Sequence, residues 1–137
     1  MRSTLICLAL IACGGGESKP DAAQVPVDAP VARQTVMETK SLLVGDLVEA
    51  TLTGGPGDSA VISLDAPVAK LDWNIHGHAG GSSQTVKEEL LVMSVRYTFS
   101  PTAAAPWSLL LRNRDTAAMS VTVKIELFGN MQWSGWQ

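Results

Sequence analysis

The two histidines of this chain lie two residues apart, in His76-Gly77-His78. On an extended strand, alternate side chains project from the same face, so the two imidazoles would lie together with Cα atoms about 6.6 Å apart. Neutral imidazoles at that spacing can share a divalent metal ion, and Asp72 would lie on the same face of the strand. The pattern therefore gives a candidate metal site on His76, His78 and Asp72.

The same segment lacks features that a complete metal site requires. A cupin metal site also begins with His-x-His, but there a glutamate follows within about five residues and another histidine comes later. Here Ala79-Gly80-Gly81-Ser82-Ser83 follows, and the chain has no third histidine. The alternative is a polar strand end that enters a glycine-rich loop with two solvated histidines. We therefore expect no resident cofactor, with a divalent metal as the alternative.

Other catalytic arrangements are not expected. The sequence has no GxSxG element that would place a serine nucleophile on a sharp turn. Glu88 and Glu89 are adjacent, so on a strand they would point to opposite faces and would not act as an acid–base pair. Ser82 and Ser83 lie near His78, but closeness in sequence does not make a triad. These patterns predict a protein that is not an enzyme.

Two tryptophans lie within the last five residues, in Trp133-Ser134-Gly135-Trp136-Gln137. Exposed indoles can stack on sugars or form a protein contact. The alternative is that both fold back and cap the domain, because terminal segments must be tied down to stay ordered. Trp133 and Trp136 are thus candidate ligand contacts, with carbohydrate recognition as one alternative function.

The elements that would position these residues are strands. From Val68 to His76 and from Met119 to Leu127, apolar and polar residues alternate with period two, which is typical of strands with one buried and one solvated face. Trp73 and Trp107 lie on apolar faces and are predicted core residues. Four more strands are predicted by their composition and by the turn residues between them, at 47–53, 60–64, 91–99 and 107–112.

Many short antiparallel strands separated by turns predict an all-β domain, an antiparallel two-sheet β-sandwich. The sequence leaves the secondary structure of one segment undecided. Thr85-Val86-Lys87-Glu88 fits a helix capping box, so residues 86–92 are either one or two helical turns or a strand.

The run from Pro106 to Asn113, followed by the alternating strand from Val121 to Leu127, resembles the last strand pair of GOLD and bacterial pre-peptidase C-terminal domains. The shared features are an aromatic and apolar strand ending in Arg-Asn, a polar turn and a valine-rich strand. The resemblance implies a jelly-roll-like β-sandwich. It carries no catalytic residue, and it implies a binding, cargo or secretion accessory.

The N-terminus resembles a bacterial lipoprotein signal. Arg2 precedes a short apolar run, and Leu10-Ile11-Ala12-Cys13 fits the lipobox. The run is far shorter than the roughly 20 residues that span a bilayer as a helix. The resemblance implies that residues 1–12 are removed and that Cys13 carries lipid and anchors the mature chain in a membrane. Because Cys7 leaves with the signal, the mature domain would contain no thiol and no disulfide.

Residues 13–40 are rich in Gly, Pro, Ala, Asp and Val and contain no aromatic residue. Such a composition predicts a disordered linker that could extend on the order of 80 Å. The folded domain is then expected at 41–137, which contains all the aromatic residues. Gly14 stands where lipoproteins retained in the inner membrane often have aspartate, so the resemblance implies an outer-membrane location in a Gram-negative cell envelope.

The charge of the domain excludes one class of partner. From Ser41 to Gln137 there are six Lys and Arg against nine Asp and Glu, with no basic cluster, so nucleic acid is not an expected partner. The sequence thus predicts a lipid-anchored cell-envelope protein with a non-catalytic β-sandwich that binds an envelope protein or polysaccharide or has a structural role. The alternatives are metal binding and carbohydrate recognition.

Overall fold

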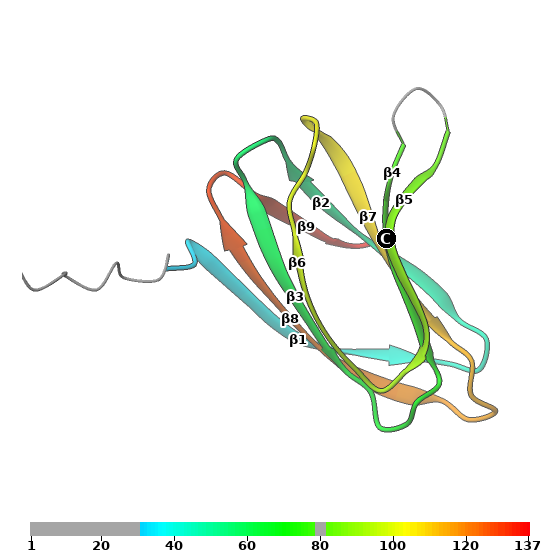
Figure 1. Cartoon of the computed structure of the whole chain (residues 1–137). Helices are drawn as coiled ribbons and strands as arrows, with labels where there is room; N and C mark the ends of the chain where they lie inside the picture. Colours follow the sequence, from blue (N-terminus) through cyan, green and yellow to red (C-terminus); the bar gives the residue numbers. More distant parts are fainter. Residues whose placement is uncertain (1–30, 79–81) are drawn as a thin grey trace, which may run out of the picture.

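The computed structural model describes residues 31–78 and 82–137. Within these ranges every regular element is a β-strand, and the strands form two antiparallel sheets (Figure 1). One hydrophobic core lies between the sheets, so the predicted all-β, two-sheet sandwich is confirmed. In this part of the chain no helix is long and apolar enough to cross a membrane.

The strand order is that of a jelly roll with one added strand. The four-stranded sheet consists, in spatial order, of β1 (Gln34–Leu42), β8 (Met119–Phe128), β3 (Ser59–Asp65) and β6 (Ser94–Phe99). The five-stranded sheet consists of β5 (Gln84–Val92), β4 (Leu71–Gly77), β7 (Ala105–Asn113), β2 (Leu47–Gly54) and β9 (Gln132–Trp136). The first eight strands pair as in an eight-stranded jelly roll, and β9 extends one edge beside β2.

The strands form where the period-two pattern predicts them, because one face of each strand can be buried. In β8, alternate residues from Met119 to Leu127 are buried, and the strand pairs with β1 on one side and β3 on the other. In β4, Leu71, Trp73 and Ile75 face the core. The inward faces of the two sheets meet in the layered packing that is typical of sandwiches.

Aromatic pairs fill the centre of the core. The ring centroids of Phe99 and Trp107 are 5.2 Å apart in an edge-to-face arrangement, and those of Trp73 and Tyr97 are 5.6 Å apart. Trp73 is fully buried and Trp107 nearly so. Both predicted core tryptophans are therefore confirmed, and each is in contact with an aromatic residue from the other sheet.

The domain begins earlier than the sequence predicts. Strand β1 starts at Gln34 and pairs with β8 along its whole length, so the predicted linker boundary at residue 40 is wrong for residues 34–40. The reason is that β1 is an edge strand whose inward positions include Glu38 and Lys40, and its pattern therefore does not have the apolar alternation of a central strand. Residues 13–30 of the predicted linker, with Cys13, lie outside the described residues.

The segment with two open interpretations is a strand. Residues 86–92 belong to β5, which pairs with β4, so the helical alternative is wrong. Pairing with β4 outweighs the local helix-capping signal here. In the strand, Lys87 and Glu89 lie on one side, and Lys87 Nζ forms an ion pair of 2.8 Å with Glu89 Oε1. The strand predicted at 91–99 is divided at Met93, and Leu91 has a positive φ of 55° beside an irregularity in the pairing.

One carboxylate joins two connections between the sheets, β2–β3 and β8–β9, at one end of the sandwich. Asp58 accepts a hydrogen bond from the Gly55 amide at 2.9 Å and one from the Asn130 amide at 2.7 Å. These two backbone hydrogen bonds, the one from Asn130 first, lower the pKa of Asp58 below its ordinary value. Gly129 has a φ of 69°, and a Cβ there would lie 2.5 Å from Asp58 Oδ1, so the approach requires glycine.

We expect Asp58 to make the stability of the domain depend on pH in the acid range. Because its pKa is lowered in the folded state, its contribution is present above the unfolded pKa near 3.8 and is lost as pH falls through the folded value. Thermal midpoints of the native chain and Asp58→Asn, measured from about pH 6 to about pH 2, should differ most at the higher pH and converge in acid. Asp65→Asn, at the exposed end of β3, is the control. A gap that stays constant with pH would contradict the role assigned to Asp58.

Candidate functional site

The open side of the sandwich between the edge strands β1 and β9 is closed by tryptophans. Trp133 and Trp136 are half-buried, pack against the core and have ring centroids 5.6 Å apart. Trp136 Nε1 donates a hydrogen bond to Glu38 Oε1 at 2.5 Å, and Lys40 Nζ lies 5.1 Å from the centroid of the Trp136 ring. Inward charged residues on an edge strand also hinder pairing with another chain. The polar residues of β1 therefore have defined partners on β9.

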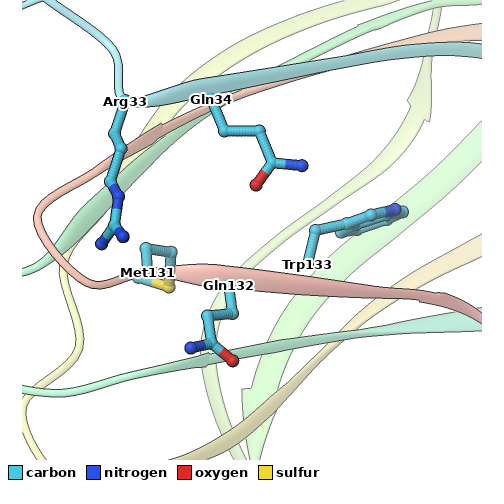
Figure 2. A pocket seen from close by; sticks show the side chains of 5 residues that line it. All are labelled: Arg33, Gln34, Met131, Gln132 and Trp133. Carbon is cyan, nitrogen blue, oxygen red and sulfur yellow. The ribbon is translucent and has the colours of Figure 1, made fainter.

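A solvent-open groove lies beside this contact, with a volume of about 340 Å³. Its lining residues come from the start of β1 and from the β8–β9 turn and β9: Arg33, Gln34, Met131, Gln132 and Trp133. Figure 2 shows Arg33 and Gln34 reaching from β1 towards β9, where Trp133 rises from the strand. The groove is thus formed by two segments that are far apart in the sequence.

The groove combines a cation, two carboxamides and an indole. Arg33 is exposed, and its Nη1 has only long contacts, 3.4 Å to Gly129 O and 3.5 Å to Asn130 Oδ1. Among the residues that the structure describes, the ion pairs do not include Arg33. Carboxamides can donate and accept hydrogen bonds at once, and an indole offers a flat apolar face. This set of groups can bind a small polar ligand.

The two predicted ligand-contact residues have different positions. Trp133 lines the groove, whereas Trp136 lies next to it and is held by Glu38 and Lys40. Both indoles also cover the core, as the capping alternative predicts, but they do so from an edge strand, β9, that the sequence pattern does not indicate.

The two histidines lie together on the outer face of β4. Their ring centroids are 4.9 Å apart in an edge-to-face arrangement. His76 is only 6% exposed; its Nδ1 lies 2.8 Å from Asn74 Oδ1, and its Nε2 lies 3.8 Å from Glu49 Oε1. Burial lowers the pKa of His76 below its ordinary value, and Glu49 opposes this shift. The prediction that both imidazoles share one region is confirmed.

The third predicted ligand is not part of this cluster. The Asp72 carboxylate forms an ion pair with Arg114 Nε at 3.1 Å and accepts a hydrogen bond from the Leu91 amide at 2.9 Å. Within residues 31–78 and 82–137, no three histidine, cysteine or carboxylate side chains are grouped so that they could hold a metal ion. The predicted set of His76, His78 and Asp72 is therefore not assembled, because Asp72 is bound by another strand and loop. Residues 79–81 of the glycine-rich loop lie outside the described residues.

Figure 1 shows that the β1–β2, β3–β4, β5–β6 and β7–β8 connections lie at one end of the sandwich. Large exposed apolar residues lie in or beside three of these connections. We call residues 43–46, 66–70, 93 and 114–118, with the adjoining strand ends, the loop end. Its large exposed apolar residues are Leu43, Val44, Leu47, Val68, Leu90, Leu91 and Met93. A soluble domain rarely exposes such a group of residues at one place unless the surface makes a contact.

Hydrogen bonds hold the loop end in one arrangement. The buried Asn113 donates from Nδ2 to the carbonyls of Leu42, Leu43 and Ala117, at 3.3, 3.0 and 2.9 Å, and accepts from the Asp115 amide at 2.8 Å. Backbone hydrogen bonds link neighbouring connections: Ala66 N to Met93 O at 2.7 Å, Arg114 N to Lys70 O at 2.8 Å and Asn113 N to Asp46 O at 3.0 Å. The exposed apolar residues are therefore presented on an ordered scaffold.

Neither the groove nor the loop end was predicted from the sequence. The one available signal for the loop end is local: Leu43 and Val44 precede Gly45-Asp46, so apolar residues lie in a turn where polar ones are usual. For the groove there is no local signal, because Arg33 and Gln34 are about a hundred positions from Trp133 in the sequence.

No family model and no curated protein matches the sequence. The solved structures with a similar fold include two bacterial proteins. The Yersinia pseudotuberculosis-derived mitogen is 12% identical with a TM-score of 0.56, over 76% of this chain and 94% of that chain. Aeromonas hydrophila PliG, a periplasmic lysozyme inhibitor of g-type lysozyme, is 9% identical with a TM-score of 0.50, over 68% of this chain and 85% of that chain. At these identities the likeness shows the fold alone: the chain is a β-sandwich similar to those of the mitogen and the inhibitor.

Proposed function

We propose that this chain is a lipid-anchored protein of the cell envelope whose β-sandwich binds a partner protein through the loop end, without catalysing a reaction. The lipobox pattern Leu10-Ile11-Ala12-Cys13 supports the anchor, with Cys13 as the lipidated residue. Gly14 supports an outer-membrane location. Several acyl chains on one cysteine give stable anchoring, which a single chain does not.

The observation that carries the binding proposal is the group of exposed apolar residues on the ordered loop end. Exposed apolar residues at one end of a domain favour an interaction there. A rigid surface also avoids part of the entropy cost of ordering loops on binding. The connections of a sandwich are common binding positions, because loop sequences can vary on a fixed scaffold.

The charges around the patch favour a protein partner over a lipid surface. The charged residues in and beside these connections, which form the rim of the loop end, are of both signs: Lys70, Arg112, Arg114, Asp46, Asp72 and Asp115. Anionic membranes attract segments with an excess of Lys and Arg, which this rim does not have. An apolar centre with a mixed polar rim is the usual composition of a protein–protein interface.

The position of the loop end relative to the chain entry also supports the proposal. Strand β1 runs from Gln34 to Leu42, so Arg33 lies at the opposite end of the sandwich from Leu43. A chain anchored at Cys13 therefore enters the domain at the end away from the apolar patch. The chain entry would then leave the loop end uncovered, and the tether would keep the domain at high effective concentration near envelope partners.

The relation to the structural neighbours is limited to the fold. One of them is named as an inhibitor of g-type lysozyme, so that protein acts on another protein. We do not infer the partner of this chain from the inhibitor, because 9% identity shows shared architecture only.

The proposal is tested by crosslinking the full chain in its native cells. A photo-reactive amino acid is introduced at Val68, in the middle of the loop end. The crosslink is then compared between the native background, Val44→Lys/Met93→Lys and the matched variant Met37→Lys. Val44, Met93 and Met37 are 59%, 53% and 67% exposed, so none of these changes should impair folding. We expect one discrete protein adduct, lost in the double variant and kept in Met37→Lys, and release of Cys13→Ser from the membrane fraction.

Three other results would overturn the proposal. An adduct with the mass of two copies of this chain would make the loop end a contact between copies. Membrane retention of Cys13→Ser that depends on Val44 and Met93 would make the loop end a lipid-binding surface. An adduct that is unchanged in the double variant would show that the apolar residues do not form the contact.

A further inference from the structure

The groove between β1 and β9 contains chemistry that the loop-end contact does not use. It offers hydrogen-bonding carboxamides on Gln34 and Gln132, an indole on Trp133 and a guanidinium on Arg33. Its volume, about 340 Å³, is in the range of small-molecule sites.

The guanidinium of Arg33 gives the groove a preference for anions. Its contacts to Gly129 O and Asn130 Oδ1 are long, at 3.4 and 3.5 Å, so most of its donors are available to a ligand. The nearby carboxylates are already engaged: Asp58 accepts from two backbone amides, and Glu38 accepts from Trp136. A ligand carboxylate could therefore bind Arg33 without displacing a protein carboxylate from it.

The opposite wall of the groove is held in place. Met131 is buried, and its Sδ would lie 2.7 Å from a Cβ at Gly54, so the methionine is packed closely on the β2 backbone. Trp133 is supported by the Trp136 ring at 5.6 Å, and β9 pairs with β2 along most of its length. A rigid indole beside hydrogen-bonding side chains is the arrangement that can stack on the apolar face of a sugar ring while its hydroxyl groups are bound.

We infer that this groove binds an acidic saccharide: the sugar ring lies on Trp133, its hydroxyl groups bind the carboxamides of Gln34 and Gln132, and its carboxylate binds Arg33. This goes beyond the proposed protein contact, because it uses a different surface and a different chemistry. Carbohydrate recognition is thereby assigned to Trp133, with Trp136 in a supporting position outside the groove.

The test is isothermal titration of the full chain in detergent with a trimer of galacturonic acid and, separately, with the neutral galactose trimer. The variants are Arg33→Gln, which removes the charge and keeps hydrogen-bonding capacity, and Arg96→Gln, an exposed arginine on β6, as the control. Arg33 is exposed, so its replacement should not affect folding. We expect the acidic trimer to bind about tenfold more tightly than the neutral one, and Arg33→Gln to remove that difference.

Several outcomes would overturn the inference. If neither trimer binds at about 10 mM, a concentration at which even weak saccharide sites are partly occupied, the groove is not a saccharide site. If both trimers bind equally, or if Arg33→Gln and Arg96→Gln behave alike, the carboxylate contact is wrong. The variant Val44→Lys/Met93→Lys should bind the acidic trimer like the native chain, which keeps failure of this inference distinct from failure of the loop-end proposal.

Discussion

Replacing Asn113 by alanine is expected to lower the free energy of unfolding by about 2–4 kcal/mol. The side chain is fully buried and is the donor or acceptor in hydrogen bonds to Leu42, Leu43, Asp115 and Ala117. Alanine would remove these hydrogen bonds. The Leu43 carbonyl would keep its bond from the Asp46 amide, but each of the other groups that stays out of water without a partner adds to the cost. Urea unfolding of the full chain, followed by tryptophan fluorescence, measures the loss.

Two further variants separate the hydrogen bonds from the loss of volume. Asn113→Asp keeps the size and the acceptor for the Asp115 amide, but it places a carboxylate against three carbonyl oxygens, so it should be at least as destabilising as alanine. Asn130→Ala removes an exposed asparagine from the β8–β9 turn and should change stability by less than about 0.5 kcal/mol. A loss below about 0.5 kcal/mol in Asn113→Ala would show that the loop end does not depend on this side chain.

Asn113 also links the stability of the domain to the proposed contact between the loop end and a partner protein. Its bonds join the β1–β2 turn, which carries Leu43 and Val44, to the β7–β8 connection. Without them the apolar residues would lose their fixed arrangement, and binding of the partner would include the cost of ordering them again. Hydrogen exchange of the amide of Asp115 should therefore be faster in Asn113→Ala by more than the global destabilisation accounts for.

Replacing Trp73 by alanine is expected to cost about 3–5 kcal/mol. Trp73 is the largest fully buried side chain, lies on central strand β4 and packs against Tyr97 of the other sheet, with ring centroids 5.6 Å apart. The change removes buried apolar surface and leaves a cavity that the surrounding strands can fill only in part. In a domain of ordinary stability, such a loss is a large fraction of the total.

A second contact of Trp73 allows a more specific test. Its Nε1 donates a hydrogen bond to Glu89 Oε2 at 3.2 Å, and the pKa of Glu89 is lowered by its hydrogen bond with Lys87 and then by this one. Trp73→Phe keeps most of the ring volume and removes the donor, so it should cost less than Trp73→Ala and raise the pKa of Glu89, as measured by NMR titration. Equal losses in the two variants would show that buried volume at Trp73 is not the main contribution.

The central strands could be predicted from the sequence because their signal is local. In β4 and β8 every second residue is apolar, since each strand has one face in the core. Edge strands lack this signal. Gln34, Glu38 and Lys40 occupy inward positions of β1 because that strand lies at the border of the sheet, where polar side chains can reach β9 and solvent. The sequence therefore indicates a linker where the fold has a strand.

The sequence does not decide the structure of β5 for a different reason, because its local pattern fits both a helix and a strand. Thr85 and Glu88 have the spacing of a helix cap, and only pairing with β4 decides for the strand.

The spacing of His76 and His78 is enough to predict that their imidazoles are neighbours. The direction of Asp72 could not be predicted, because its partner Arg114 belongs to a connection 42 positions later in the sequence.

Local sequence patterns therefore predict the class of the domain, the residues at the centre of its core and the shared position of His76 and His78. The lipobox pattern predicts the anchor at Cys13. The tertiary structure shows where the domain begins, that Trp133 lines a groove with Arg33, and that exposed apolar residues of three connections lie at one end of the sandwich. The alternation of apolar residues and the spacing of motifs report only on residues that are close in sequence. Both candidate binding surfaces are instead formed by sheet pairing, which joins residues that share no pattern along the chain.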